Sequence, residues 1–291
     1  MLKNFRLSFD SSLHLINIQL EISKNQFLKK MLSKLISPIE KVGHFTLLNL
    51  AKLGEISLFT FNSVKHCFSP PFYPRLILRQ FLQIGYFSLP VVGLTAIFSG
   101  AVLALQSYSG FSRFNAESTI ATVVVLSITR ELGPVLAGLM VAGRVGASMA
   151  AEIGTMKVTE QIDALRTLST NPFKYLFAPR IIAGTLMLPL LVLIADIIGV
   201  LGGYLVSVHS LGFSSGPYIS NTFKFLERID VVSGLTKAGF FGFIISIMGC
   251  YFGYNSKGGA EGVGVATTNA VVAASIVILL LNYMITGWFF G

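Results

Sequence analysis

The chain has little charge for its length. Only 12% of its 291 residues are Asp, Glu, Lys or Arg, against about 25% in soluble proteins, and 53% are hydrophobic. Its two cysteines, Cys67 and Cys250, lie far apart in apolar sequence, which excludes a disulfide framework. These scarcities indicate an integral membrane protein.

The sequence also lacks the motifs of an enzyme. It contains no GxxxxGK[ST] loop for nucleotide phosphates, so any ATP hydrolysis would belong to another polypeptide. Gly212, Ser214 and Gly216 match the GxSxG pattern of hydrolases, but that motif needs a downstream histidine and the last one, His209, precedes it. The four histidines have no metal-ligand spacing. We expect no catalytic residue, no metal site and no cofactor.

Residues 1–80 form a basic N-terminal region, with eleven Lys and Arg against four acids. This balance of +7 predicts that the N-terminus faces the cytoplasm or stroma. Residues 27–36, FLKKMLSKLI, have an apolar stripe beside three lysines, which favours an amphipathic helix in the membrane surface over a helix packed on protein. Residues 45–61 are too interrupted by Lys52, Gly54 and Glu55 to span. We expect no nucleic-acid partner.

Residues 81–291 contain five segments long enough to cross a bilayer core, which needs about 20 residues. The fold class is therefore all-α, with N-terminal interfacial helices followed by five transmembrane helices. Because five is odd, the C-terminus is expected on the outer side, and the more basic loop after the second span faces inward. The predicted spans are Gly85–Leu105, Ile120–Met149, Ile181–Val208, Val231–Tyr254 and Val263–Phe290.

Several charges lie inside these spans, where each costs about 2.5–3.5 kcal/mol on insertion scales and so usually faces a cavity or a partner. Pro134 cannot donate a hydrogen bond to the carbonyl of Arg130, which predicts a kink there. Pairing of Arg130 with Asp196, or of Glu131 with Lys237, would lower the cost, but the sequence leaves the pairing open. We assign a lipid cavity or a mechanical switch to Arg130, Glu131, Pro134, Arg144, Asp196 and Lys237.

Small residues recur every fourth position in and beyond the second span, at Gly138, Ala142, Gly146, Ala150 and Gly154. Such a row lets another helix approach closely, either within one subunit or in a dimer. Residues 157–168, KVTEQIDALRTL, instead have an apolar stripe and a mixed-charge face, which without other information indicates a solvated loop helix.

The segment ELGPVLAGLMVAGRVGASMAAEIGTMKVTEQIDALRTLSTNP closely resembles the signature of the MlaE family of ABC-transporter permeases. The resemblance continues through FAPRIIAGTLMLPLL and GGYLVSV to ATTNAVVAASIVILLLNYMIT, and covers about residues 80–291. About the first forty residues match no pattern. The resemblance implies the membrane subunit of a lipid-trafficking transporter.

It further implies a coupling helix near residues 152–168 that docks on a separate ATP-binding subunit. Its contact residues would be Glu152, Lys157, Glu160, Asp163 and Arg166. The other implied partners are an MCE-type substrate-binding protein, a second copy in a homodimer, and a glycerophospholipid substrate, or phosphatidic acid in plastids. In this family, closure of the ATPase would push the coupling helix and reshape a lipid cavity.

Two other classes remain open: a secondary transporter of a small solute and a non-transporting membrane scaffold. The first would show internal repeats, and none is visible; the second would not need charges in three spans. The 24 phenylalanines, with frequent Lys, Ile and Asn, are typical of an AT-rich genome such as an algal plastid's. This favours the plastid inner envelope over a bacterial inner membrane.

Overall fold

The computed structural model describes residues 43, 44, 46–114 and 116–291. The chain divides into two units, residues 1–58 and residues 59–291. The sequence suggests a different division near residue 80, where the basic N-terminal region gives way to the apolar spans. That division stays a prediction. The predicted interfacial helix at residues 27–36 lies outside the described residues. In the first unit, residues 46–58 are helical.

Five helical stretches of the second unit are long and apolar enough to cross a membrane, which confirms the all-α class and the five predicted spans. At 1.5 Å per residue, a stretch of 38 residues is about 57 Å long, whereas the hydrocarbon core is about 30 Å thick. The ends of the first three stretches therefore extend beyond the core. The stretches are Pro74–Phe111, Ile120–Val158, Phe173–His209, Arg228–Tyr254 and Gly259–Phe290.

Each of the first three stretches is built from consecutive helical segments. The first joins α2 (Pro74–Ile84) to α3 (Leu89–Phe111). The third joins a π-helical turn, η6 (Phe173–Phe177), to α8 (Ala178–His209). The second alternates α-helix with wider π-helical turns, in the order α4 (Ile120–Ser127), η4 (Ile128–Leu132), α5 (Gly133–Val141), η5 (Ala142–Gly146) and α6 (Ala147–Val158).

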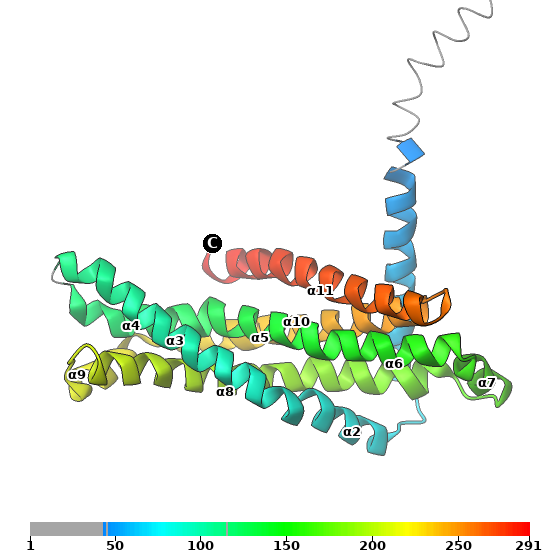
Figure 1. Ribbon diagram of the computed structural model, residues 1–291, viewed down its shortest axis with the longest axis horizontal. Coiled ribbons are helices and arrows are strands. Elements are labelled where there is room, and N and C mark those ends of the chain that lie inside the picture. The colour runs from blue at the N-terminus through cyan, green and yellow to red at the C-terminus, as the bar shows by residue number, and fades with distance from the viewer. Residues whose placement is uncertain (1–42, 45, 115) are drawn as a thin grey trace, which may run out of the picture. The chain divides into compact units, whose positions relative to one another are not determined.

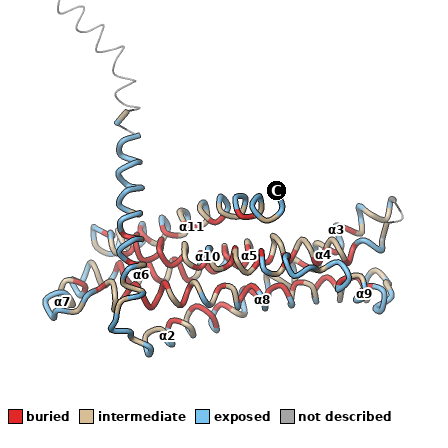
Figure 2. The backbone as a smooth tube through the Cα atoms, turned by 180° about the vertical axis from the view of Figure 1, so that it is seen from behind, coloured by how far each residue is buried: buried red, intermediate tan, exposed pale blue. Residues whose placement is uncertain are grey.

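The last two spans are the single helices α10 (Arg228–Tyr254) and α11 (Gly259–Phe290). Helix α10 contacts α6, α8 and α11, and α3 packs on α8 (Figure 1). Burial follows this arrangement, because α10 is buried along most of its length while α11 and α3 leave one face open (Figure 2). Two short helices, α7 (Gln161–Thr167) and α9 (Ser215–Phe225), lie in the connections.

Helix α10 touches its neighbours backbone to backbone. A Cβ atom on Gly242 would lie 2.1 Å from the carbonyl oxygen of Gly184 on α8. On the other side, a Cβ on Gly253 would lie 2.8 Å from the carbonyl oxygen of Ala150 on α6. Small residues therefore allow three helices to approach more closely than larger side chains would permit.

The row of small residues predicted in the second span faces this interface within the chain. Ala142 and Ala150 are fully buried. The Cβ position of Gly138 meets Phe241, and that of Gly146 meets Ile245, both on α10. Gly154 lies against Ser256 and Val263. The row thus contacts α10 and the start of α11 in the same subunit.

Every helical stretch extends beyond its predicted span at one end or both, and the predicted helix at residues 157–168 was wrong. Residues 157–168 do not form one helix: α6 ends at Val158, and Glu160 adopts a left-handed φ of 60° before α7 begins. Consecutive β-branched Val158 and Thr159 favour a helix end there, and the reversal buries Ile162 completely. The last span begins at Gly259 rather than Val263. Gly258 and Gly259 adopt positive φ angles in the turn before it. Glu261, in the first turn, interacts favourably with the positive end of the helix dipole.

A pair of glycine substitutions on α10 tests the close helix contact. Gly242→Ala should destabilise the protein by about 1–3 kcal/mol, since the new methyl group would overlap the Gly184 carbonyl. Gly239→Ala is the matched control, because its Cβ would lie 3.9 Å from Pro189 and it should change stability by less than about 0.5 kcal/mol. Equal melting temperatures of the two variants in detergent would contradict the packing.

Candidate functional site

A buried lysine on α10 binds the irregular turn η4 of the second span. The Nζ atom of Lys237, whose side chain is completely buried, donates to the carbonyl oxygen of Arg130 at 2.7 Å and to Oε1 of Glu131 at 2.8 Å. Pro134 leaves that carbonyl without one backbone donor, as predicted, and the π-helical turn η4 lies directly before it. The lysine therefore stabilises an irregular helical turn and pairs with a carboxylate at the same time.

Glu131 extends this contact to α11. Its Oε2 accepts from Nδ2 of Asn282 at 2.7 Å, and its Oε1 accepts from the hydroxyl of Thr286 at 2.9 Å. Asn282 and Thr286 are four residues apart and so share a face of α11. The sequence shows this polar pair on an apolar helix, but their role in binding Glu131 was missed.

Arg130 pairs with Asp230. The sequence suggests Asp196 as its partner, in one of two pairings left open. The Nε atom of Arg130 lies 2.7 Å from Oδ1 of Asp230, and its guanidinium lies 4.3 Å from the centre of the Phe290 ring. Asp230 was placed outside the predicted span and was therefore not considered. It also caps α10, because its Oδ2 accepts from the backbone N–H of Glu227. The other open pairing, Glu131 with Lys237, is present.

We define the charge network as Arg130, Glu131, Asp230, Lys237, Asn282 and Thr286. Asp196 and Arg144 do not belong to it. Asp196 is buried against Gly133, and its Oδ1 has no hydrogen-bond partner among the described residues. Arg144 instead donates to the carbonyl oxygen of Gln83 and to the Ser88 hydroxyl, both at 3.1 Å. The six residues predicted for one cavity or switch thus occupy three places.

Four of the five predicted coupling residues lie near Tyr254, the last residue of α10. Asp163 on α7 accepts from Lys157 Nζ at 3.0 Å and lies 3.6 Å from Arg166 Nη1. Arg166 also donates to the hydroxyl of Tyr254, the last residue of α10, and both cations lie within 6 Å of the Tyr254 ring. Glu160 is exposed beside them. Much of the mixed-charge face is therefore bound to α10.

Tyr254 in turn belongs to an aromatic cluster. Its ring lies 5.5 Å from that of Phe177 and 6.0 Å from that of Phe59, and Phe173 contacts all three. Such tilted and edge-on pairs are more stabilising than their buried area alone implies. The cluster fixes the end of α10 to η6 and to residue 59, so that α7 rests on a rigid base.

Glu152, the remaining predicted coupling residue, lies away from α7. Its Oε1 accepts from Nε2 of Gln83 on α2 at 2.9 Å, and its Oε2 accepts from Nη2 of Arg180 on α8 at 2.8 Å. Both oxygens are engaged inside the chain. Glu152 therefore ties α6 to α2 and α8.

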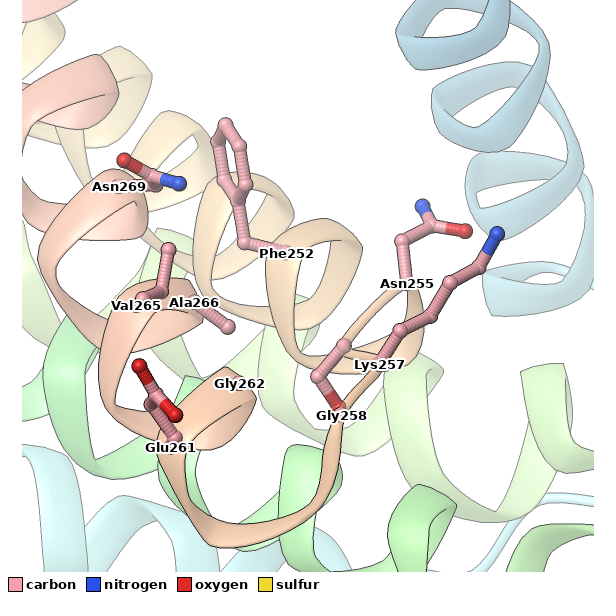
Figure 3. A pocket seen from close by; sticks show the side chains of 10 residues that line it. Phe252, Asn255, Lys257, Gly258, Glu261, Gly262, Val265, Ala266 and Asn269 are labelled. Atoms are coloured by element: carbon pink, nitrogen blue, oxygen red, sulfur yellow. The ribbon is translucent and has the colours of Figure 1, made fainter.

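A cavity of about 370 Å³ lies at the turn between α10 and α11 (Figure 3). Its walls carry one cation, Lys257, and one carboxylate, Glu261, and their charges offset each other. No residue of the charge network lines it. The cavity is thus separate from the features that connect the spans.

Comparison with known proteins gives the family. The family model described as Permease MlaE matches residues 77–288. A probable ABC transporter permease protein of Rickettsia felis is 64% identical over 256 residues, which are 88% of this chain and 99% of that protein. The intermembrane phospholipid transport system permease protein MlaE of Haemophilus influenzae is 38% identical over 74% of this chain and 83% of that protein.

A plant relative is the Arabidopsis thaliana protein trigalactosyldiacylglycerol 1, which is chloroplastic. It is 38% identical over 216 residues, which are 74% of this chain and 62% of that protein. The family match covers the charge network, α7 and all but the outermost residues of the five spans. The chain belongs to the MlaE family of ABC transporter permeases, as its sequence resemblance indicates.

Proposed function

We propose that this permease moves glycerophospholipids across or out of a membrane, driven by a separate ATP-binding subunit that docks on α7. The observation that carries the proposal is the position of α10, which contacts α7 through its last residue, Tyr254, and the charge network through Lys237, 17 residues earlier. The relative in Haemophilus is a phospholipid transport permease, which supports the substrate class.

The docking surface is formed by the exposed residues of the loop. Glu160 and Leu168 are exposed, Leu168 by 74%, while the basic residues behind them hold α7 on Tyr254. An exposed apolar side chain beside charged ones is suited to a protein partner, since the apolar group gives affinity and the charges give specificity. A push on α7 would reach α10 through this contact.

Movement of α10 would then act on the charge network. Lys237 lies 17 residues before Tyr254, which is about 25 Å along the helix. Because α10 is packed tightly against α6 and α8, it would move as a rod and displace Lys237 from Glu131 and the Arg130 carbonyl. That shift would release α11 from Glu131 and open space for a lipid between the spans.

The open faces of α3 and α11 suit lipid or a second copy of the chain. Tyr283 and Trp288 on α11 are 82% and 80% exposed, and the outer face of α3 carries exposed Leu94 and Phe98. We propose a homodimer with two ATP-binding subunits and an MCE-type substrate-binding protein on the outer side, in keeping with the family.

We propose a bacterial inner membrane as the location. The Rickettsia relative matches 88% of the chain at 64% identity, whereas the chloroplastic relative is 38% identical. The plastid inner envelope, favoured by composition, stays the second candidate.

Lys237→Met tests the network, with Glu131→Gln added to separate function from folding. The single variant leaves a carboxylate without its cation and should lower both yield and transport. The double variant removes both charges, so its yield should recover while lipid transport stays at least about tenfold below wild type. Lys224→Met, at an exposed lysine on α9, is the control. Transport at the wild-type rate by the double variant would reduce the network to a structural role.

Charge reversal of Glu160 tests the docking surface. Glu160→Lys should weaken co-purification of the ATP-binding subunit and lower transport, because the residue is exposed on the proposed contact. Glu261→Lys, at an exposed carboxylate in the first turn of α11, should change neither. If both variants behave as wild type, α7 does not bind the ATPase through this face.

Cysteine labelling tests the orientation in the membrane. In a background lacking Cys67 and Cys250, a membrane-impermeant maleimide applied from outside should label a cysteine at Ser214 but not one at Ser169. External labelling at Ser169 would place α7 where no soluble ATPase can reach it.

A further inference from the structure

We propose that a polar crevice between α2, α6 and α8 binds the phosphate of an anionic phospholipid headgroup. Two adjoining cavities form the crevice, one of about 200 Å³ and one of about 160 Å³, and both are lined by Gln80, Gln83 and Glu152. The site is separate from the charge network, shares no residue with it, and does not depend on the proposed direction or mechanism of transport.

Positive charge dominates the walls of the crevice. Arg79 and Arg180 line the larger cavity and Arg144 lines the smaller one, against the single carboxylate of Glu152. That carboxylate already accepts from Gln83 and Arg180, so its charge is offset within the chain. The remaining positive charge favours an anion, and guanidinium groups match the geometry of phosphate oxygens.

Two side chains that line the crevice have donor groups without a protein partner among the described residues. Arg180 is 7% exposed, and its Nε atom has no hydrogen-bond partner among the described residues. Gln80 is 9% exposed, lines both cavities, and makes no hydrogen bond through its amide within the part of the chain that the structure describes. An unsatisfied buried donor such as Arg180 Nε is costly, so it indicates a ligand that supplies an acceptor.

The surroundings identify the anion as part of a lipid. Leu78 and Leu82 on the outer face of α2 are 63% and 55% exposed, and Phe87 just beyond is 59% exposed. Arg79 lies between the two leucines in sequence and shares their exposed face. A helix with apolar and cationic residues on its open face is typical of the headgroup boundary, where acyl chains cover the former and phosphates meet the latter.

The crevice also lies at the right depth. Helix α2, the end of α6 and the start of α8 lie at one end of the first three stretches, and each of these stretches is longer than the bilayer core is thick. All three occur at the end of the spans that carries α7 (Figure 1). The lipid would therefore belong to the leaflet that faces the ATP-binding subunit.

The test compares two arginines of the same helix in the full-length chain. Arg75 is exposed on α2 like Arg79 but does not line the crevice. Delipidated protein is titrated with phosphatidylglycerol or phosphatidylcholine, and bound lipid is measured by native mass spectrometry. Arg79→Gln should weaken phosphatidylglycerol binding by about tenfold, and Gln80→Leu should also weaken it, whereas Arg75→Gln should change it by less than about twofold.

Wild-type protein should prefer phosphatidylglycerol to phosphatidylcholine, and millimolar inorganic phosphate should not displace the lipid. Equal losses in the Arg75 and Arg79 variants would reduce the effect to general surface charge and overturn the proposal. Displacement by inorganic phosphate would overturn the lipid as the ligand in favour of a free anion. The binding assay contains no ATP-binding subunit, so a negative result does not bear on the proposed transport function. Conversely, loss of transport in the charge-network or α7 variants does not bear on this lipid site.

Discussion

The contact between Lys237 and the Arg130–Glu131 turn is the constraint on which the arrangement of the spans depends. A fully buried ammonium is expensive, and here it is matched by a carboxylate and by a carbonyl oxygen that Pro134 cannot bond. Removing any one of the three would leave another unsatisfied. The π-helical turn η4, the start of α10 and the face of α11 near Asn282 are thereby held together.

Helix α10 connects this contact to the surface. Backbone-close crossings hold α10 against α6 and α8, and in our proposal the helix moves as one rigid body. At the end of α10, Tyr254 binds Arg166 and the aromatic cluster. A transporter driven from outside the membrane needs such a link between a rigid docking surface and a polar contact that can open. In our proposal α10 is that link.

The sequence predicted much of the fold and part of this site. Hydrophobic length located five spans, and the missing donor at Pro134 located the Arg130 carbonyl that Lys237 binds. Apolar runs do not fix helix ends, because amphipathic turns such as α2 continue a span beyond the core. Apolar runs also do not identify ion-pair partners, because Arg130 and Asp230 are one hundred positions apart in the chain. Position in space, which periodicity does not encode, decided between Asp230 and Asp196.

The most direct test measures whether α7 and α11 move together through Lys237. Spin labels are placed at Leu168 and Tyr283, both largely exposed, in one copy of the chain within the complex with its ATP-binding subunit. The distances between the two spin labels are measured by double electron–electron resonance, with and without trapped nucleotide. We predict a change in the distance distribution in the wild-type background and its loss in the background that carries both Lys237→Met and Glu131→Gln. An identical change in both backgrounds would contradict transmission through the charge network.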